Sequence, residues 1–108
     1  MRLAREADLQ RTILDYLRLH RIFHWRSNSG KVRVKGGWVK LAPKGSPDIF
    51  AVPKGDGRLL GIEVKMPGEV QSEEQKAFQR AMETAGCDYV VVYDVSDLEE
   101  VEVVLGIE

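Results

Sequence analysis

Two acidic residues and one lysine have the types and spacing to form a chemically active site. Asp48 stands at the start of an apolar run, and Glu63 and Lys65 lie two residues apart in a second apolar run. Side chains two apart on a strand leave the same face of a sheet, so Glu63 and Lys65 would point the same way. If residues 48–52 pair with residues 59–65 as a hairpin, Asp48 comes beside Glu63. We therefore expect two carboxylates and one ammonium at one place.

Such a pair of carboxylates suits a hard divalent cation. Carboxylate and carbonyl oxygens favour magnesium or manganese over zinc, and without a cation the two acids would repel each other. A bound ion can acidify a water and stabilise charge on a phosphate oxygen, while the ammonium of Lys65 can stabilise negative charge or assist proton transfer. This chemistry favours phosphodiester hydrolysis. The alternative is a turn cap at Asp48 and an exposed Glu63–Lys65 pair on a strand.

Apolar periodicity predicts the elements that must position these residues. Ser72 and Gln75 have capping-box spacing, and Gly86 is a candidate helix stop. The expected elements, in chain order, are a helix over residues 4–20, two or three short strands within 22–41, the hairpin of 47–52 with 59–65, a helix over 73–85 and a strand over 89–93. This order predicts a mixed α/β fold, and the length predicts one domain spanning residues 1–108.

The polar and apolar residues of the first helix share one stripe. Glu6, Gln10, Ile13 and Leu17 recur at helical spacing. Polar residues on such a stripe most often lie at the solvated end of a core helix. The alternative is that Glu6 and Gln10 reach into a polar site.

The C-terminal residues fit two structures. Ser96 and Glu99 have the spacing of a capping box, which predicts a helix. Val101, Val103 and Leu105 instead alternate as the residues of a strand would. We expect the helix, with its leucines directed inward.

The charges are segregated along the chain. The net charge is −1, yet all 16 Lys and Arg lie within residues 1–80, and the seven basic residues from Arg21 to Lys44 have no acidic residue among them. This pattern suggests a polyanion such as nucleic acid, although an exposed basic loop without a partner is an equal alternative. Of the two tryptophans, Trp38 is the better candidate for a nucleic-acid contact. The residues expected to contact backbone phosphates are Lys31, Arg33, Lys35, Lys40 and Lys44.

Composition narrows the class of protein further. The single cysteine, Cys87, excludes an intramolecular disulfide and a cysteine zinc site. No apolar run approaches the ~20 residues of a membrane-spanning helix. The N-terminus turns polar at once, so we expect no secretory signal, no membrane association and a cytoplasmic location.

Three stretches of the chain resemble the virus-type replication-repair nuclease (VRR-NUC) domain of the PD-(D/E)-x-K nuclease superfamily. They are Gly45-Ser46-Pro47-Asp48, Gly61-Ile62-Glu63-Val64-Lys65, and Ser72 with Gln75 on the following helix. The likeness extends from Glu6 to Tyr93 and is closest to the stand-alone phage and bacterial members. It implies a restriction-endonuclease-like αβββαβ core, a mixed sheet flanked by helices.

The resemblance also implies site residues. It assigns a Mg²⁺ or Mn²⁺ ion to Glu6, Asp48, Glu63 and the carbonyl of Val64. It assigns catalysis to Asp48, Glu63, Lys65 and Gln75, with the glutamine orienting the site from the side. The alternative for Gln75 is the capping box alone, and the two roles are compatible.

The activity expected from the resemblance is a structure-selective endonuclease. Its partner would be branched or double-stranded DNA, such as a Holliday junction, and its oligomeric state a homodimer. Two alternatives stay open at this stage: a non-catalytic module that binds nucleic acid or a partner protein on the same fold, and a nuclease that acts on RNA.

Overall fold

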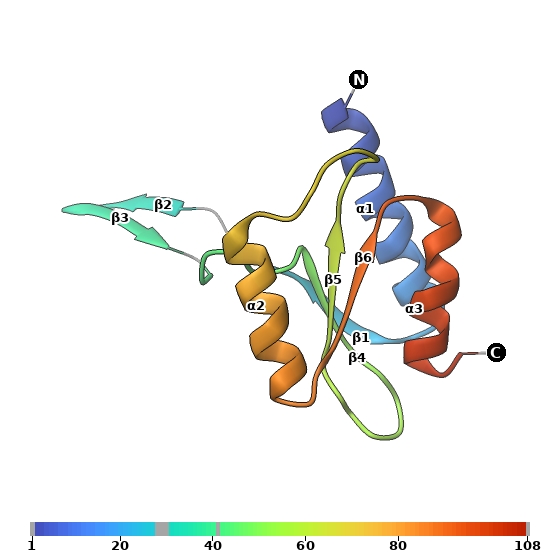
Figure 1. The fold of residues 1–108 in the computed structure, drawn as a ribbon. Helices are drawn as coiled ribbons and strands as arrows, with labels where there is room; N and C mark the ends of the chain where they lie inside the picture. Colours follow the sequence, from blue (N-terminus) through green and yellow to red (C-terminus); the bar gives the residue numbers. More distant parts are fainter. Residues whose placement is uncertain (1, 28–30, 41, 108) are drawn as a thin grey trace.

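The computed structural model describes residues 2–27, 31–40 and 42–107, and they form a mixed α/β fold (Figure 1). The elements, in chain order, are α1 (Arg2–Leu19), β1 (Phe23–Arg26), β2 (Lys31–Val34), β3 (Gly37–Lys40), β4 (Ile49–Val52), β5 (Leu60–Val64), α2 (Glu73–Thr84), β6 (Asp88–Val92), the 3₁₀ turn η1 (Val95–Asp97) and α3 (Leu98–Leu105). The fold class expected from the sequence is therefore confirmed.

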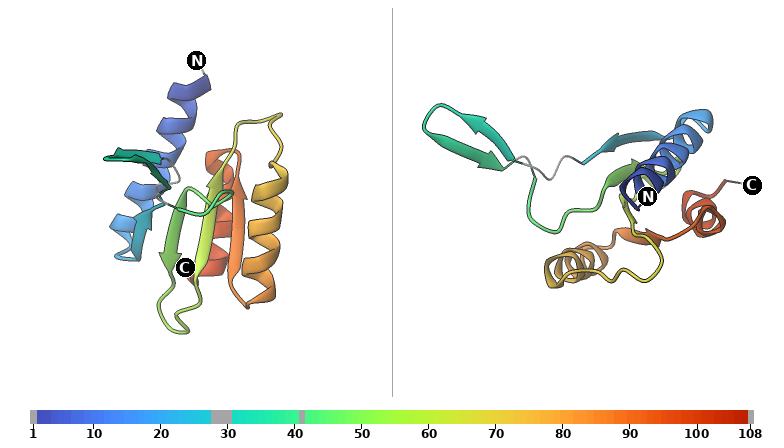
Figure 2. Two further views of the ribbon diagram at one scale, coloured as in Figure 1. Left: turned by 90° about the vertical axis from the view of Figure 1, so that its left-hand side faces the viewer. Right: turned by 90° about the horizontal axis from the view of Figure 1, so that it is seen from above.

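Four strands form the main sheet, in the order β1-β4-β5-β6. The β1–β4 and β4–β5 pairs are antiparallel, and β5–β6 is parallel because α2 crosses over between them. Helices α1 and α3 cover one face of the sheet and α2 covers the other (Figures 1 and 2). The predicted αβββαβ core corresponds to α1, β1, β4, β5, α2 and β6.

The hydrophobic core lies between the sheet and the α1–α3 layer. Ile62 and Val64 of β5 point into it, with Ile13 of α1 and Val101 of α3 fully buried opposite them. Burying one such side chain contributes roughly 1.5–3 kcal/mol, so this layer supplies most of the stabilisation of the sheet. The other face of β5 is left for Glu63 and lies under α2.

Strands β2 and β3 form a separate two-stranded sheet that projects from the body of the molecule (Figures 1 and 2). The short strands predicted within residues 22–41 are confirmed, but they do not all belong together. β1 joins the main sheet because it pairs with β4 over its whole length, from Phe23 opposite Val52 to Arg26 opposite Ile49. The hairpin is thus an insertion between two neighbouring strands of the main sheet.

Local signals set the ends of the second helix. The predicted capping box is confirmed, because Ser72 and Gln75 cap each other reciprocally at the start of α2. The helix ends at Thr84, and Gly86 follows with φ of 92°, a conformation that glycine adopts at little cost.

The C-terminal helix is confirmed, but the capping box predicted for it at Ser96 and Glu99 is wrong. The box is formed two residues earlier, where Asp94 and Asp97 cap the 3₁₀ turn that leads into α3. The carboxylate of Asp94 accepts hydrogen bonds from both the backbone N–H and the hydroxyl of Ser96, which lower the pKa of Asp94. A carboxylate accepts two such bonds at once, so it outcompetes the serine as the cap.

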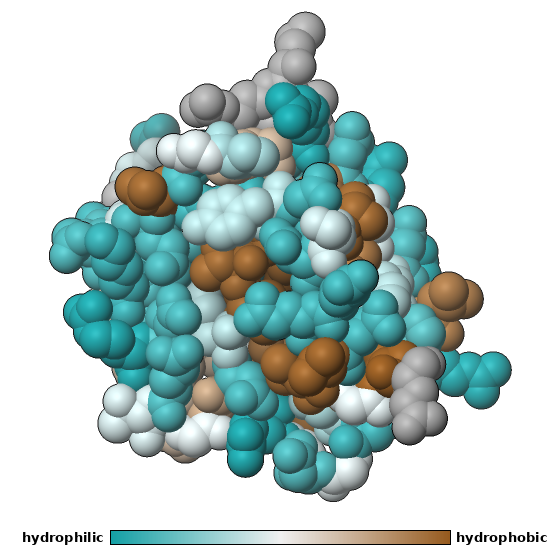
Figure 3. Space-filling view, turned by 45° about the vertical axis from the view of Figure 1, so that its right-hand side comes forward, coloured by the Kyte–Doolittle hydropathy of each residue, from teal (hydrophilic) through white to brown (hydrophobic). Residues whose placement is uncertain are grey.

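The outer surface on the α1–α3 side is mostly hydrophilic. Figure 3 shows hydrophobic residues there as islands separated by hydrophilic side chains. Among the described residues, no helix combines the length and apolar character needed to cross a membrane.

Candidate active site

The register of the β4–β5 pair brings Asp48 and Glu63 together. Ile49 lies opposite Ile62, so the next pair along the strands is Asp48 and Glu63. The Oδ2 atom of Asp48 accepts a hydrogen bond from the backbone N–H of Val64 at 2.7 Å, which ties the loop before β4 to the end of β5. The predicted juxtaposition of these acids is confirmed, while their roles stay predictions.

Four charged or polar groups act on the carboxyl group of Asp48. Burial is the largest influence and raises the pKa of Asp48, and the negative charge of Glu63 raises it further. The N–H of Val64 and the positive charges of Lys65 and Arg26 oppose this rise without cancelling it. Lys65 is therefore close enough for its positive charge to act on the carboxyl group of Asp48, as the two-residue spacing from Glu63 predicts.

The side chain of Glu63 is buried and not exposed to solvent. It is 1% exposed, and its Oε1 atom accepts a hydrogen bond from the hydroxyl of Tyr89 on β6. Its Oε2 atom is buried and has no hydrogen-bond partner in the structure. The alternative of an exposed Glu63–Lys65 pair on the strand surface is therefore wrong.

Tyr89 is held in its protonated form beside this carboxylate. Burial first, and then the hydrogen bond and negative charge of Glu63, raise the pKa of Tyr89. The phenol consequently stays a hydrogen-bond donor. Because the phenol occupies Oε1, Oε2 is the oxygen of Glu63 that is left to bind a further group.

A glycine in β5 makes room for this arrangement. A Cβ atom at Gly61 would lie 3.1 Å from the Sδ of Met82, the Cγ of Pro47 and the Cδ2 of Tyr89. All three neighbours would have to shift by a few tenths of an ångström to admit it. The glycine therefore lets the ring of Tyr89 lie against β5 at the position from which it reaches Glu63.

A second glycine fixes the loop that carries Asp48. Gly45 has φ of 89°, and a Cβ atom there would lie 2.3 Å from the carbonyl oxygen of Glu74 in the first turn of α2. Only glycine permits so close an approach of two backbones. Lys44 adds an ion pair to Glu74 at 3.3 Å, so the loop before Asp48 is clamped to the start of α2.

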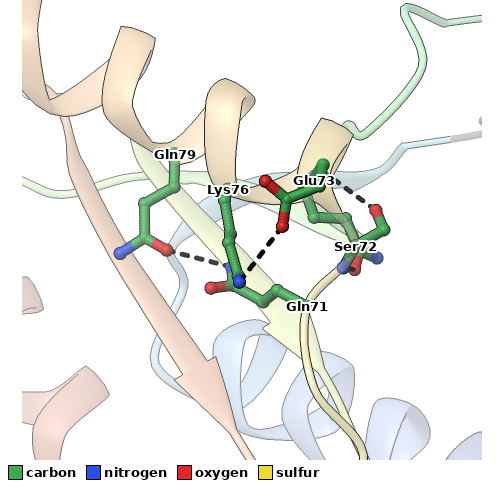
Figure 4. Close-up of polar contacts among 6 residues, drawn as sticks. Gln71, Ser72, Glu73, Lys76 and Gln79 are labelled. Atoms are coloured by element: carbon green, nitrogen blue, oxygen red, sulfur yellow. Dashed lines mark hydrogen bonds and ion pairs between the residues drawn. The ribbon is translucent and has the colours of Figure 1, made fainter.

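The side chain of Gln75 belongs to the start of α2. Its carboxamide oxygen accepts from the backbone N–H of Ser72 at 2.8 Å, and the backbone N–H of Gln75 donates to the Ser72 hydroxyl at 3.1 Å. Figure 4 shows this end of the helix, with Lys76 paired to Glu73 on its outer side. The contacts are those of the capping-box alternative, and the orienting role expected for Gln75 stays a prediction.

A different glutamine is connected to the buried carboxylate. Gln71 donates from Nε2 to the Oε1 of Gln79 at 2.9 Å (Figure 4). A hydrogen bond from Gln71 also opposes the rise in the pKa of Tyr89. Gln71, Tyr89 and Glu63 therefore form one polar connection from α2 to β5.

Helix α1 approaches the site through its polar residues. The Oε1 atom of Gln10 accepts from the guanidinium of Arg26 at 3.4 Å, and the charge of Arg26 acts on Asp48. This supports the alternative in which Gln10 serves a polar site. Glu6 lies one turn earlier and is half-buried, and its expected place among the metal ligands stays a prediction.

The donor set at the centre of the site fits a hard cation. Across residues 2–27, 31–40 and 42–107 no three His, Cys, Asp or Glu gather in a way that could hold a metal ion. Asp48 and Glu63 are a pair, however, and a divalent ion would relieve both the unpartnered Oε2 atom and the unfavourable proximity of the buried Glu63 to the half-buried Asp48. Such an ion would complete its shell with carbonyl, water or phosphate oxygens.

The residues predicted to contact phosphate divide into three kinds. Arg33 and Lys35 lie exposed on the projecting hairpin. Lys44 is exposed at the clamp with α2. The side chains of Lys31 and Lys40 lie outside the described residues.

Sequence reasoning missed Tyr89, Gln71 and Arg26. Tyr89 reads as one more apolar residue of a buried strand, and its single distinguishing signal is a phenol at the start of a run of valines. Arg26 reads as the polar end of an alternating strand. No family model, curated protein or solved structure matches this chain. The function proposed for it therefore rests on the site and its motifs.

Proposed function

We propose that this protein is a Mg²⁺- or Mn²⁺-dependent nuclease that hydrolyses phosphodiester bonds in DNA. One observation carries the proposal: Asp48, just before β4, lies beside Glu63 of β5 with the charge of Lys65 acting on it, and one oxygen of the buried Glu63 has no partner. A buried, unpaired carboxylate oxygen is costly unless a ligand uses it. A hard cation is the ligand that suits two carboxylates.

Each residue has a distinct role in this proposal. Asp48 and Glu63 would hold the ion, with the carbonyl of Val64 as a further ligand. When bound, the ion supplies an acidified water and neutralises charge on the phosphate. Tyr89 keeps Oε1 of Glu63 occupied, so Oε2 is the oxygen that would bind the ion. Lys65 stabilises the negative charge that develops on the phosphate oxygens.

The resemblance to VRR-NUC domains supports this proposal and extends it. The fold class is compatible with the family's core, and Glu63 lies in β5 with Asp48 just before β4 and Lys65 just after β5. From the same resemblance we propose branched DNA as a substrate, a homodimer as the active form and the cytoplasm as the location. Glu6 and Gln75 keep their proposed roles as metal ligand and orienting residue.

The decisive experiment measures cleavage by single-residue variants. The protein is incubated with branched and linear DNA in Mg²⁺ or Mn²⁺, and Lys65→Ala is compared with Lys54→Ala, which removes an exposed lysine in the β4–β5 turn. We expect Lys65→Ala to lose roughly 100-fold or more in rate and Lys54→Ala to match the wild type. Cleavage by Lys65→Ala at the wild-type rate would overturn the proposal.

Two further measurements separate the alternatives. Parallel assays on RNA of the same sequence distinguish a deoxyribonuclease from a ribonuclease. Calorimetric titration with Mn²⁺ tests the non-catalytic alternative, because a binding module should show no affinity for the ion that Asp48→Ala abolishes.

A further inference from the structure

The β2–β3 hairpin has no structural role in the body of the molecule. It extends away from the main sheet (Figures 1 and 2), and none of its described residues belongs to the hydrophobic core. Its described side chains from Arg33 to Val39 are all exposed. An isolated two-stranded hairpin is at best marginally stable in water, so a bound partner would stabilise this one.

One pair of side chains dominates the hairpin. Arg33 and Trp38 lie directly opposite each other in the register, so they share a face of the ribbon. The guanidinium of Arg33 lies 6.0 Å from the centre of the Trp38 ring, within the range of a cation–π contact. The ring is nevertheless 64% exposed, which is rare for a tryptophan without a ligand or partner.

The charge around this pair selects the kind of partner. The hairpin lies within the stretch from Arg21 to Lys44, which contains seven basic residues and no acidic one. A flat aromatic ring beside a guanidinium, in a stretch of basic residues, is complementary to a nucleobase flanked by phosphates.

The base must be an unpaired one. In a continuous duplex each base is covered on both faces by its neighbours, so a side chain outside the helix finds no face to stack on. At a gap, a flap or a junction, a base face is open to Trp38. We propose that Trp38 stacks on an unpaired base while Arg33 and Lys35 contact the adjacent phosphates, which makes the hairpin the element that recognises discontinuities in the nucleic acid.

The position of the hairpin connects this recognition to the acid pair. Its two connections to the body leave from the end of β1 and return just before β4. There the backbone N–H of Ser27 donates to the carbonyl of Asp48 at 2.8 Å. The base of the hairpin therefore adjoins the residue at which the proposed function places cleavage. The inference rests on that function and names the substrate class of the same site.

The test measures binding separately from cleavage. Fluorescence anisotropy in EDTA is recorded for a continuous duplex, the same duplex with a one-nucleotide gap or a flap, and a single strand. Trp38→Ala and Trp38→Phe are compared with Phe23→Ala, which removes a similarly exposed aromatic ring (70% exposed) from β1. We expect Trp38→Ala to bind gapped, flapped and single-stranded DNA roughly tenfold more weakly, with its duplex affinity unchanged. Trp38→Phe should keep most of the preference, and Phe23→Ala all of it.

Direct evidence for stacking comes from tryptophan emission. In a Trp25→Phe background, Trp38 is the one remaining tryptophan of the chain. Its fluorescence should be quenched by gapped DNA and hardly at all by the continuous duplex.

Several outcomes would overturn the inference. Equal losses on all DNA forms would make Trp38 a general contact, and an unchanged preference would exclude it from recognition. A change of molecular mass on Trp38→Ala, measured by light scattering, would make the hairpin a contact between copies of the chain. Failure of the proposed nuclease function is a separate result, because it appears as absent cleavage by the wild type while the binding preference is still measurable.

Discussion

The acid site in the body of the molecule and the β2–β3 hairpin differ in how far their side chains are exposed to solvent. In the body, even a glutamate is enclosed, and its hydrogen bond to Tyr89 lies between β5 and β6. In the hairpin, a tryptophan and its neighbouring valines remain open to solvent. A buried polar group is retained at a cost in stability when it serves chemistry, and an exposed aromatic group is retained when it serves contact. The contrast is what we expect if the body carries the proposed reaction and the hairpin the proposed recognition.

The largest expected difference between the two regions is in stability. Ile62→Ala removes a fully buried side chain from the core and should lower the free energy of unfolding by about 3 kcal/mol. Val39→Ala, on the hairpin, should change it by less than about 0.5 kcal/mol, because that side chain is already exposed. Urea unfolding followed by circular dichroism measures both. Equal losses would mean that the hairpin belongs to the cooperative core.

A smaller effect is expected at the buried pair of Glu63 and Tyr89. Tyr89→Phe removes the hydroxyl and leaves both oxygens of Glu63 without a partner, which should cost roughly 1–2 kcal/mol. Adding Mn²⁺ should recover part of this loss if the ion binds the freed carboxylate. The control is Tyr93→Phe, which changes an exposed tyrosine at the end of the same strand. If Tyr89→Phe were as stable as the wild type, the hydroxyl of Tyr89 would have no stabilising role at the site.

The smallest effect expected is a gain in stability at Asp48. The raised pKa of Asp48 means that the folded state disfavours its charge, so the penalty is absent below its ordinary pKa of about 4, grows as the pH rises from there to the folded-state pKa, and is fully present above it. Asp48→Asn keeps an oxygen for the N–H of Val64 but carries no charge. It should therefore be more stable than the wild type by about 1 kcal/mol at pH 7, with no gain near pH 3.

Unfolding curves of both proteins at the two pH values decide this point. A variant less stable than the wild type at pH 7 would show that the hydrogen bond to Val64 outweighs the buried charge. A gain at pH 7 would measure how much stability the body gives up to hold the charge of Asp48.

Short-range patterns in the sequence determined much of the local structure of this protein. The β4–β5 hairpin that brings Asp48 beside Glu63 was predictable, and so was the capping box of Ser72 and Gln75. Strand alternation and helix caps both depend on residues close in sequence. The C-terminal helix was predictable for the same reason, although its cap was placed two residues late. There, several polar residues compete for the same N–H groups, and spacing alone does not choose among them.

Only the tertiary structure decided what surrounds the acid pair. Tyr89 reaches Glu63 because β5 and β6 pair in one parallel register, and Arg26 acts on Asp48 because β1 joins the main sheet while β2 and β3 do not. The full burial of Glu63 likewise depends on α2 crossing over its face. These arrangements involve residues far apart along the chain, whose approach depends on how whole elements pack and not on any local preference of the residues themselves.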